Sequence, residues 1–170
     1  PRCCIRERIR HSSAAGQRGI RTMSSTQPAW DYAVLKEVAG VLADTTDGLT
    51  GKEIGDLLTS LSMEDPLPSA TKRDRLAEAF VARQNKDRSS RRIITFIVHA
   101  MAPVRYRDRP ELFSLRQDRL NERLAFVGLH VTAKGEVARG ARAETLDEAT
   151  RIATSIRDEL ARRKTHPEVL

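Results

Sequence analysis

Apolar residues recur every three or four positions along most of the chain, which is the spacing of one face of an α-helix. Capping residues, glycines and prolines divide this pattern into segments. Six helices are predicted, over residues 29–43, 50–62, 71–86, 89–102, 110–127 and 145–164. The fourth has the most apolar face, so we expect it at the centre of the core.

The predicted helix starts carry side chains that can satisfy free backbone N–H groups. Thr50 with Glu53, and Thr145 with Glu148, have the spacing of a capping box. A short polar side chain at the start of a helix can also act alone as an N-cap. The remaining predicted N-caps are Thr71 and Ser89.

Between the fifth and sixth helices the pattern changes from helical to alternating spacing. Gly128 is predicted to end the fifth helix, and two short strands follow at 129–131 and 136–138. A three-residue turn with Gly135 in the left-handed conformation sets Val131 opposite Val137. The predicted fold class is therefore mainly α, with one β-hairpin between helices five and six. A winged helix has the same order of elements, with several helices followed by a hairpin. In that interpretation, helix five would be the recognition helix.

The chain has 170 residues, enough for one domain with a hydrophobic core. We predict a disordered leader over 1–28, a single helical domain over 29–164 and a linker-like tail over 165–170. The leader lacks an initiator Met and is rich in Arg and Ser. It fits three interpretations: sequence upstream of a true start at Met23, which we favour, a fragment artefact, or an organellar transit peptide.

Two features bound the class of protein. No apolar run approaches the roughly 20 residues of a membrane span, so a membrane is not a predicted partner. Both cysteines, Cys3 and Cys4, lie in the leader. The predicted domain therefore has neither a disulfide framework nor a cysteine metal site, and a reducing cytoplasm is its simplest compartment.

The formal net charge of +7 is unevenly distributed along the chain. Residues 1–22 carry six Arg against one acid. Residues 31–65, which we call the acidic front, carry two Lys against eight acids. Residues 72–123, the basic middle, carry fourteen basic residues against seven acids. A locally basic segment is a requirement for binding phosphate groups, although it does not by itself identify a nucleic-acid partner.

The basic middle and the hairpin offer two sets of candidate nucleic-acid contacts. In the winged-helix interpretation, the fifth helix directs arginines toward phosphates or base edges and the turn contributes one lysine. The second set flanks the fourth helix, where Tyr106 could stack on a base. A solvated face is the alternative, since Asp118 and Glu122 are interleaved with the arginines. The candidates are Arg91, Arg92, Arg105, Arg107, Arg116, Arg119, Arg123 and Lys134, with Arg88 and Arg109 beside the second set.

Two Arg/His pairs have the loose spacing found in HEPN ribonucleases, namely Arg92 with His99 and Arg123 with His130. His99 falls close to the apolar face of its helix, which favours a packed or half-buried histidine over a catalytic one. The chain has no glycine-rich phosphate loop, no Ser/His/Asp arrangement and no spaced Cys/His cluster. We therefore predict no catalytic residues, no metal site and no cofactor.

Several blocks occur in a characteristic order: GLTGKEIGDLL (48–58), TKRDRL and QNKDR (within 71–88), FIVHAMAPVRY (96–106), RLNERLAFVGL (119–129) and HPEVL (166–170). Together they resemble the N-terminal region of the Ymh-type family of bacterial hypothetical proteins. The resemblance implies an association with mobile elements or phage defence, and a HEPN-like domain that follows HPEVL in the family. On this resemblance we expect the chain to be either a fragment, with the C-terminal domain missing, or a stand-alone N-terminal module. It also favours the upstream-translation interpretation of residues 1–22.

Three functions follow as hypotheses from these observations. The first is a non-enzymatic recognition module of a bacterial defence or mobile-element protein, with the basic middle binding DNA or RNA. The second is a protein-interaction or homodimerisation module, in which the acidic front of one chain attracts the basic middle of another. The third is a degenerate HEPN-type ribonuclease that uses one of the Arg/His pairs.

Overall fold

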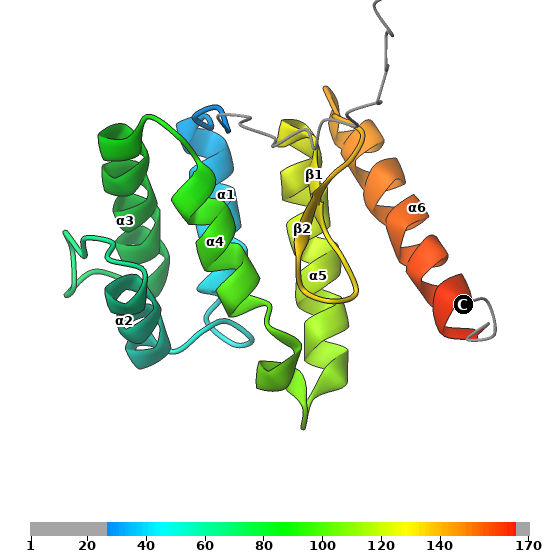
Figure 1. Cartoon of the computed structure of the whole chain (residues 1–170), viewed down its shortest axis with the longest axis horizontal. Helices are drawn as coiled ribbons and strands as arrows, with labels where there is room; N and C mark the ends of the chain where they lie inside the picture. Colours follow the sequence, from blue (N-terminus) through cyan, green and yellow to red (C-terminus); the bar gives the residue numbers. More distant parts are fainter. Residues whose placement is uncertain (1–26, 166–170) are drawn as a thin grey trace, which may run out of the picture.

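The computed structural model describes residues 27–165, and within them the predicted fold class is confirmed: six α-helices and one antiparallel β-hairpin between α5 and α6 (Figure 1). Two short 3-10 helices, η1 and η2, flank α5. In chain order the elements are α1 (Tyr32–Leu42), α2 (Gly51–Ser60), α3 (Lys72–Asp87), α4 (Arg91–Ala100), η1 (Pro103–Tyr106), α5 (Pro110–Leu124), η2 (Ala125–Val127), β1 (Leu129–Val131), β2 (Val137–Arg139) and α6 (Leu146–Thr165).

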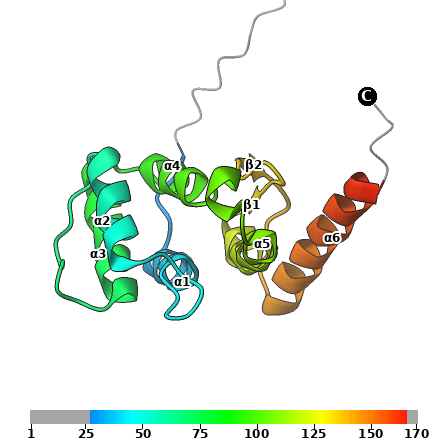
Figure 2. The ribbon, with the colours of Figure 1, turned by 90° about the horizontal axis from the view of Figure 1, so that it is seen from below.

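The hydrophobic core is shared by α1 to α5 and the inner side of β1. Figure 2 shows α4 and the hairpin on one side of this assembly and α1 on the other, with α2 and α3 at one end. The predicted core position of α4 is confirmed, because it buries Ile93, Phe96, Ile97 and Ala100 completely. Phe96 meets Phe80 of α3 edge to face, with ring centroids 5.2 Å apart.

The capping predictions hold with small differences. Thr50 and Glu53 form a complete capping box, with Thr50 N–H donating to Glu53 Oε2 at 2.8 Å. Thr71 accepts from the backbone of Asp74 at 3.3 Å. Ser89 accepts from Arg91 N–H at 3.2 Å, although Ser90 occupies the N-cap position. At α6, Glu148 N–H donates to Thr145, while the Glu148 carboxylate accepts from Glu144 instead of from Thr145.

The predicted hairpin register is also confirmed, with Val131 opposite Val137 and Gly135 in the left-handed region at φ 77°. Gly135 has a second reason to be glycine, since a Cβ there would lie 2.2 Å from the carbonyl oxygen of Met101. Two amides of α5 hold β1: Val131 N–H donates to Asn121 Oδ1 at 2.7 Å, and Gln117 Nε2 donates to the Val131 carbonyl at 3.0 Å.

The position of α5 differs from the winged-helix expectation. A recognition helix needs one face open to the groove of a duplex. Instead α5 packs against α1, α6, η1 and β1, and only Pro110, Glu111 and Leu115 in this helix are exposed. The reason is its polar core residues, which bond to neighbouring backbone groups and leave α5 enclosed. We therefore do not retain α5 as a recognition helix.

The last helix is the least buried. It packs on α5 through Ala149 and Ala153, and Arg157 adds an ion pair to Asp118 of α5 at 3.9 Å. Figure 2 shows its C-terminal end standing away from the rest of the molecule. Among the helices of residues 27–165, none is long and apolar enough to span a membrane.

Candidate nucleic-acid interface

Most of the charge contrast between the acidic front and the basic middle is used to hold the two segments together. Within residues 27–165, five ion pairs join one to the other. They are Arg73–Asp44, Arg75–Asp65, Lys86–Glu64, Arg105–Glu53 and Arg123–Glu37. The charges that suggested an external partner in the sequence are therefore largely satisfied by the fold itself.

The Arg75–Asp65 pair is the most enclosed of the five, with side-chain exposures of 15% and 26%. Arg75 Nη2 lies 2.6 Å from Asp65 Oδ2, and Nε donates to both carboxylate oxygens at 3.1 Å. Its Nη1 donates to the carbonyl of Gly51 at 2.8 Å. One guanidinium thus fixes the loop after α2, the start of α2 and the start of α3 relative to one another.

Arg116, a predicted contact residue, lies in the interior and is only 5% exposed. It donates to the Tyr106 hydroxyl at 2.5 Å and to the carbonyl oxygen of Asp47. Its guanidinium also lies 5.3 Å from the centroid of the Tyr106 ring. A phosphate has no access to this group, so we take Arg116 out of the proposed interface.

Tyr106 is not free to stack on a base either, since it is 5% exposed. Its hydroxyl donates to the carbonyl of Ala100 at 2.9 Å, and its ring meets Phe113 edge to face at 5.3 Å. Burial raises the pKa of this hydroxyl. The expectation of an exposed stacking tyrosine is wrong, because η1 turns the ring inward.

Three further predicted contacts are engaged inside the molecule. Arg92 donates to the carbonyl of Leu61 at 2.9 Å, and Arg105 lies 3.4 Å from the Glu53 carboxylate. Arg123 pairs with Glu122 at 2.5 Å and with Glu37 of α1 at 3.8 Å. Arg119 is half-buried on α5. These contacts lower the number of cations that the surface can offer to phosphate groups.

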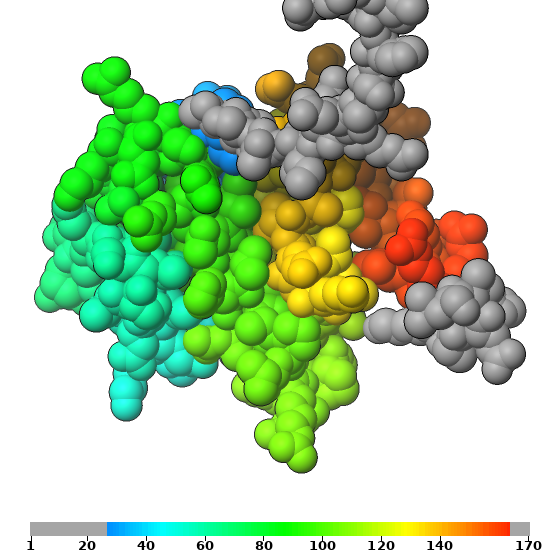
Figure 3. Space-filling view, viewed as in Figure 1, coloured from blue at the N-terminus to red at the C-terminus, as the bar shows by residue number. Residues whose placement is uncertain are grey.

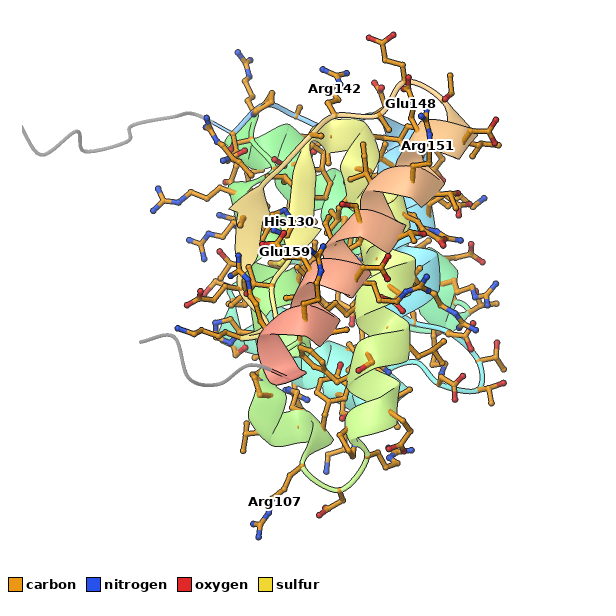
Figure 4. The ribbon with its side chains drawn as sticks, turned by 90° about the vertical axis from the view of Figure 1, so that its right-hand side faces the viewer. Arg107, His130, Arg142, Glu148, Arg151 and Glu159 are labelled. Carbon is orange, nitrogen blue, oxygen red and sulfur yellow. The ribbon has the colours of Figure 1, made fainter. Side chains whose placement is uncertain are left out.

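The two Arg/His pairs are not assembled as catalytic pairs. Arg92 is held against α2 through Leu61, while His99 is exposed, contrary to the expected packed or half-buried position. Arg123 pairs toward α1, whereas His130 lies in β1 near Glu159 of α6 (Figure 4). In the part of the chain that the structure describes, no group of three or more His, Cys, Asp and Glu residues could hold a metal ion.

The remaining predicted contacts, Arg91, Arg107 and Lys134, are exposed. They divide between two ends of the molecule: Arg91 begins α4, whereas Arg107 follows η1 beyond the other end of α4 (Figure 1). Figure 4 shows Arg107 pointing away from the body of the protein. Within residues 27–165, no ion pair or hydrogen bond engages the side chain of Arg107 or of Lys134, although the Lys134 N–H donates to the Thr132 hydroxyl at 3.3 Å.

Arg107 and the hairpin turn meet at a small pocket of about 290 Å³. In Figure 3 the turn and the η1–α5 connector lie next to each other on the lower part of the surface. The surface of the pocket is mainly apolar, and the Arg107 guanidinium and the Ser114 hydroxyl add polar groups, whereas the Gln117 amide is buried and donates to the Val131 carbonyl. The pocket is lined by Pro103, Tyr106, Arg107, Pro110, Phe113, Ser114, Gln117, Ala133 and Leu160.

Arg107, Tyr106 and the adjacent Lys134 were among the residues predicted from the sequence, whereas Phe113, Ser114 and Leu160 were not predicted as parts of one site. Leu160 comes from α6, some fifty residues further along the chain. No local pattern could place it there, since the pocket forms only when α6 packs along α5. The burial of Gln117 could have been recognised in the sequence, because this residue occupies a position on the apolar face of α5.

A larger groove of about 800 Å³ lies between the start of α1, the end of α5 and the start of α6. Trp30, Val34, Phe126 and Leu146 supply apolar surface, and charges of both signs surround them. Arg123 is the sole predicted contact residue in its lining, and Glu37 and Glu122 already neutralise that side chain. The groove therefore does not favour an anionic ligand.

We expect His130 to make the stability of the fold depend on pH. Desolvation lowers the pKa of His130 below 6.5, opposed by the nearby Glu159, and its buried Nδ1 has no hydrogen-bond partner within the described residues. Because the folded state disfavours protonation, this contribution to stability is complete above pH 6.5 and is lost as the pH falls below it. We expect thermal melts between about pH 7.5 and 5.5 to show a steeper loss for the wild type than for His130→Gln. Parallel curves for the two proteins would contradict this account.

Comparison of the chain with protein-family models, with curated proteins and with solved structures gave no match. The fold and the site define a mainly helical protein with a largely apolar pocket that Arg107 borders.

Proposed function

We propose that the chain is a non-enzymatic recognition module that binds single-stranded nucleic acid at the pocket between η1, the start of α5 and the hairpin turn. The observation that carries the proposal is the meeting of Arg107 and the Lys134 turn at one apolar pocket. In keeping with the resemblance to Ymh-type N-terminal regions, the module would belong to a bacterial defence or mobile-element protein. The cytoplasm is its proposed compartment.

The shape and chemistry of the pocket support a single strand over a duplex. A largely apolar hollow of this size can accept an unstacked base, and the hydroxyl of Ser114 can bond to its polar edge. The Phe113 ring contributes apolar surface. A base inside a duplex could not reach this hollow, whereas a single strand can turn one base into it.

Cations around the pocket support binding of the backbone. Arg107 and Lys134 are joined by Arg109, which is exposed in the connector between η1 and α5. Asp108 and Glu111 are also exposed there and reduce the local positive potential. We therefore expect modest affinity that is clearest at low salt. Three phosphate contacts on a single strand predict a slope of log K against log salt of about −2.

The test is fluorescence anisotropy with labelled single-stranded DNA and RNA of about 12 nucleotides, measured from low to physiological salt. Arg107→Glu with Lys134→Glu should weaken binding by about tenfold or more. Arg91→Glu is the matched control, since it reverses an exposed arginine at the other end of α4. An unlabelled duplex of the same sequence should compete poorly.

Equal losses for the double variant and Arg91→Glu would show diffuse charge attraction and would overturn the proposed site. Binding that does not strengthen as salt falls would overturn the nucleic-acid proposal altogether. DNA and RNA are separate arms of the experiment, because the pocket presents no feature that selects the 2′-hydroxyl.

A further inference from the structure

We propose that α6 is a homodimerisation helix, which pairs antiparallel with α6 of a second copy of this chain. The surface concerned is a stripe along α6, defined here as Glu148, Arg151, Ser155, Glu159 and Arg162, in which Glu159 lies on the side toward His130 of β1. This proposal is independent of nucleic-acid binding. It also differs from attraction between the acidic front and the basic middle, whose ion pairs close within one chain.

The stripe follows from helix geometry. Its residues recur at intervals of three or four, so they lie along one line on the surface of α6. The line lies away from the face that packs on α5, where Ala149 and Ala153 are buried. Four of the five stripe residues are exposed and Glu148 is half-buried. Figure 4 views this side of the molecule and shows Glu148, Arg151 and Glu159 along the helix.

The order of charges along the stripe is self-complementary. Read from either end, an antiparallel copy places Glu148 opposite Arg162 and Arg151 opposite Glu159, with Ser155 facing itself. A two-fold axis through Ser155 repeats both pairs, so every carboxylate meets a guanidinium. A parallel copy would instead set each charge against its own kind. The small serine at the crossing point allows the two helices to approach closely.

The surface beside the stripe is hollowed where a partner helix would lie. A shallow depression of about 430 Å³ is lined by Arg142, Glu144, Glu148, Arg151, Ile152 and Ser155. It covers the first half of the stripe and brings the half-buried Ile152 to its edge. In the antiparallel arrangement this depression receives Glu159 and Arg162 of the second copy.

A solvated helix surface could also carry mixed charges, and some are used within α6. All four charged stripe residues have a contact within the chain: Glu148 accepts from the Glu144 N–H, Arg151 Nε donates to the Asp147 carbonyl, Glu159 pairs with Arg163 one turn on, and Arg162 Nε donates to the Asp158 carbonyl. Such local pairs require only spacings of three or four residues. They do not require a charge order that is symmetric about Ser155, and they do not explain the depression. These two features together favour a second copy as the occupant.

The test uses charge reversal and measures mass by sedimentation equilibrium or light scattering on the full chain at low salt, up to about 0.5 mM. The wild type should dimerise, and added salt should weaken the dimer. Arg151→Glu sets two glutamates against each other, and Glu159→Arg sets two arginines against each other. Each should lower the association constant by about tenfold or more. Arg91→Glu on α4 is the control that should dimerise like the wild type.

Mixing the two single variants gives the decisive result. In a mixed pair, one chain carries Arg151→Glu and the other carries Glu159→Arg. The two substituted side chains then face each other with opposite charges, and so do the unchanged Glu159 of the first chain and Arg151 of the second. The mixture should therefore dimerise more strongly than either variant alone, and the double variant should regain self-association. Circular dichroism should show unchanged helix content in all variants. A monomeric wild type at the highest concentration, or a mixture that stays monomeric, would overturn the proposal.

Discussion

Replacing Arg116 by alanine is expected to lower the free energy of unfolding by about 3 kcal/mol. The substitution removes a side chain that is 5% exposed and leaves the Asp47 carbonyl without its donor. Tyr106 keeps its bond to Ala100, so part of the arrangement survives. Loss of packing adds to the cost, since the guanidinium lies over the Tyr106 ring.

Urea denaturation of three variants measures this effect and separates its parts. Arg116→Met retains most of the volume and should cost about half as much as alanine. Arg119→Ala, one turn further along the half-exposed side of α5, should change stability by about 0.5 kcal/mol or less. If Arg116→Ala were as stable as the wild type and lost only nucleic-acid binding, Arg116 would be a surface contact and the buried position would be wrong.

Arg116 also shows where sequence analysis of this chain succeeds and where it fails. Helices, their caps and the hairpin register depend on residues within a few positions of one another. Such short-range relations can be recognised directly in the amino-acid sequence. The burial of Arg116 depends on Asp47, 69 residues away. A signal was nevertheless present: the buried face of α5 reads Leu112, Phe113, Arg116, Gln117, Leu120, Asn121 and Leu124 at helical spacing.

Polar residues at core positions of an amphipathic helix therefore deserve a different interpretation from polar residues on its outer face. Buried polar groups persist when each finds a hydrogen-bond partner. On α5 those partners are backbone groups of the 43–50 loop and of β1, which surround the helix. Arg116, one of the arginines that made α5 look like a basic recognition helix, therefore helps to enclose this helix together with Gln117 and Asn121.

The difference in charge between the acidic front and the basic middle also suggested an external partner that the fold does not require. The acidic front and the basic middle are real features of the sequence, yet net charge per segment does not say whether a partner lies in the same chain. Arg73 reaches Asp44 across 29 residues, and Arg105 reaches Glu53 across 52. Only the arrangement in space separates such engaged cations from free ones such as Arg107. The candidate site is consequently smaller than the sequence predicted and lies at one end of the molecule.

The second large effect is expected at Asn121, which holds the hairpin on α5. In Asn121→Leu the buried N–H of Val131 loses its acceptor, and Gln117 still donates to the Val131 carbonyl. An unsatisfied buried N–H costs about 1–3 kcal/mol, so we expect a fall in Tm of roughly 3–10 °C. Each strand of the hairpin has three residues, so we expect it to open more readily once this anchor is lost.

Hydrogen exchange locates the effect more sharply than melting does. In the wild type, the Val131 amide should be among the protected amides of the hairpin, and Asn121→Leu should expose it while α3 and α4 stay protected. Gln117→Met is the matched control on the same helix, because it removes a donor and leaves the Val131 N–H bonded to Asn121. It should affect Val131 exchange much less. Equal exchange at Val131 in the wild type and both variants would show that packing alone, through Leu129 and Val131, holds the hairpin in place.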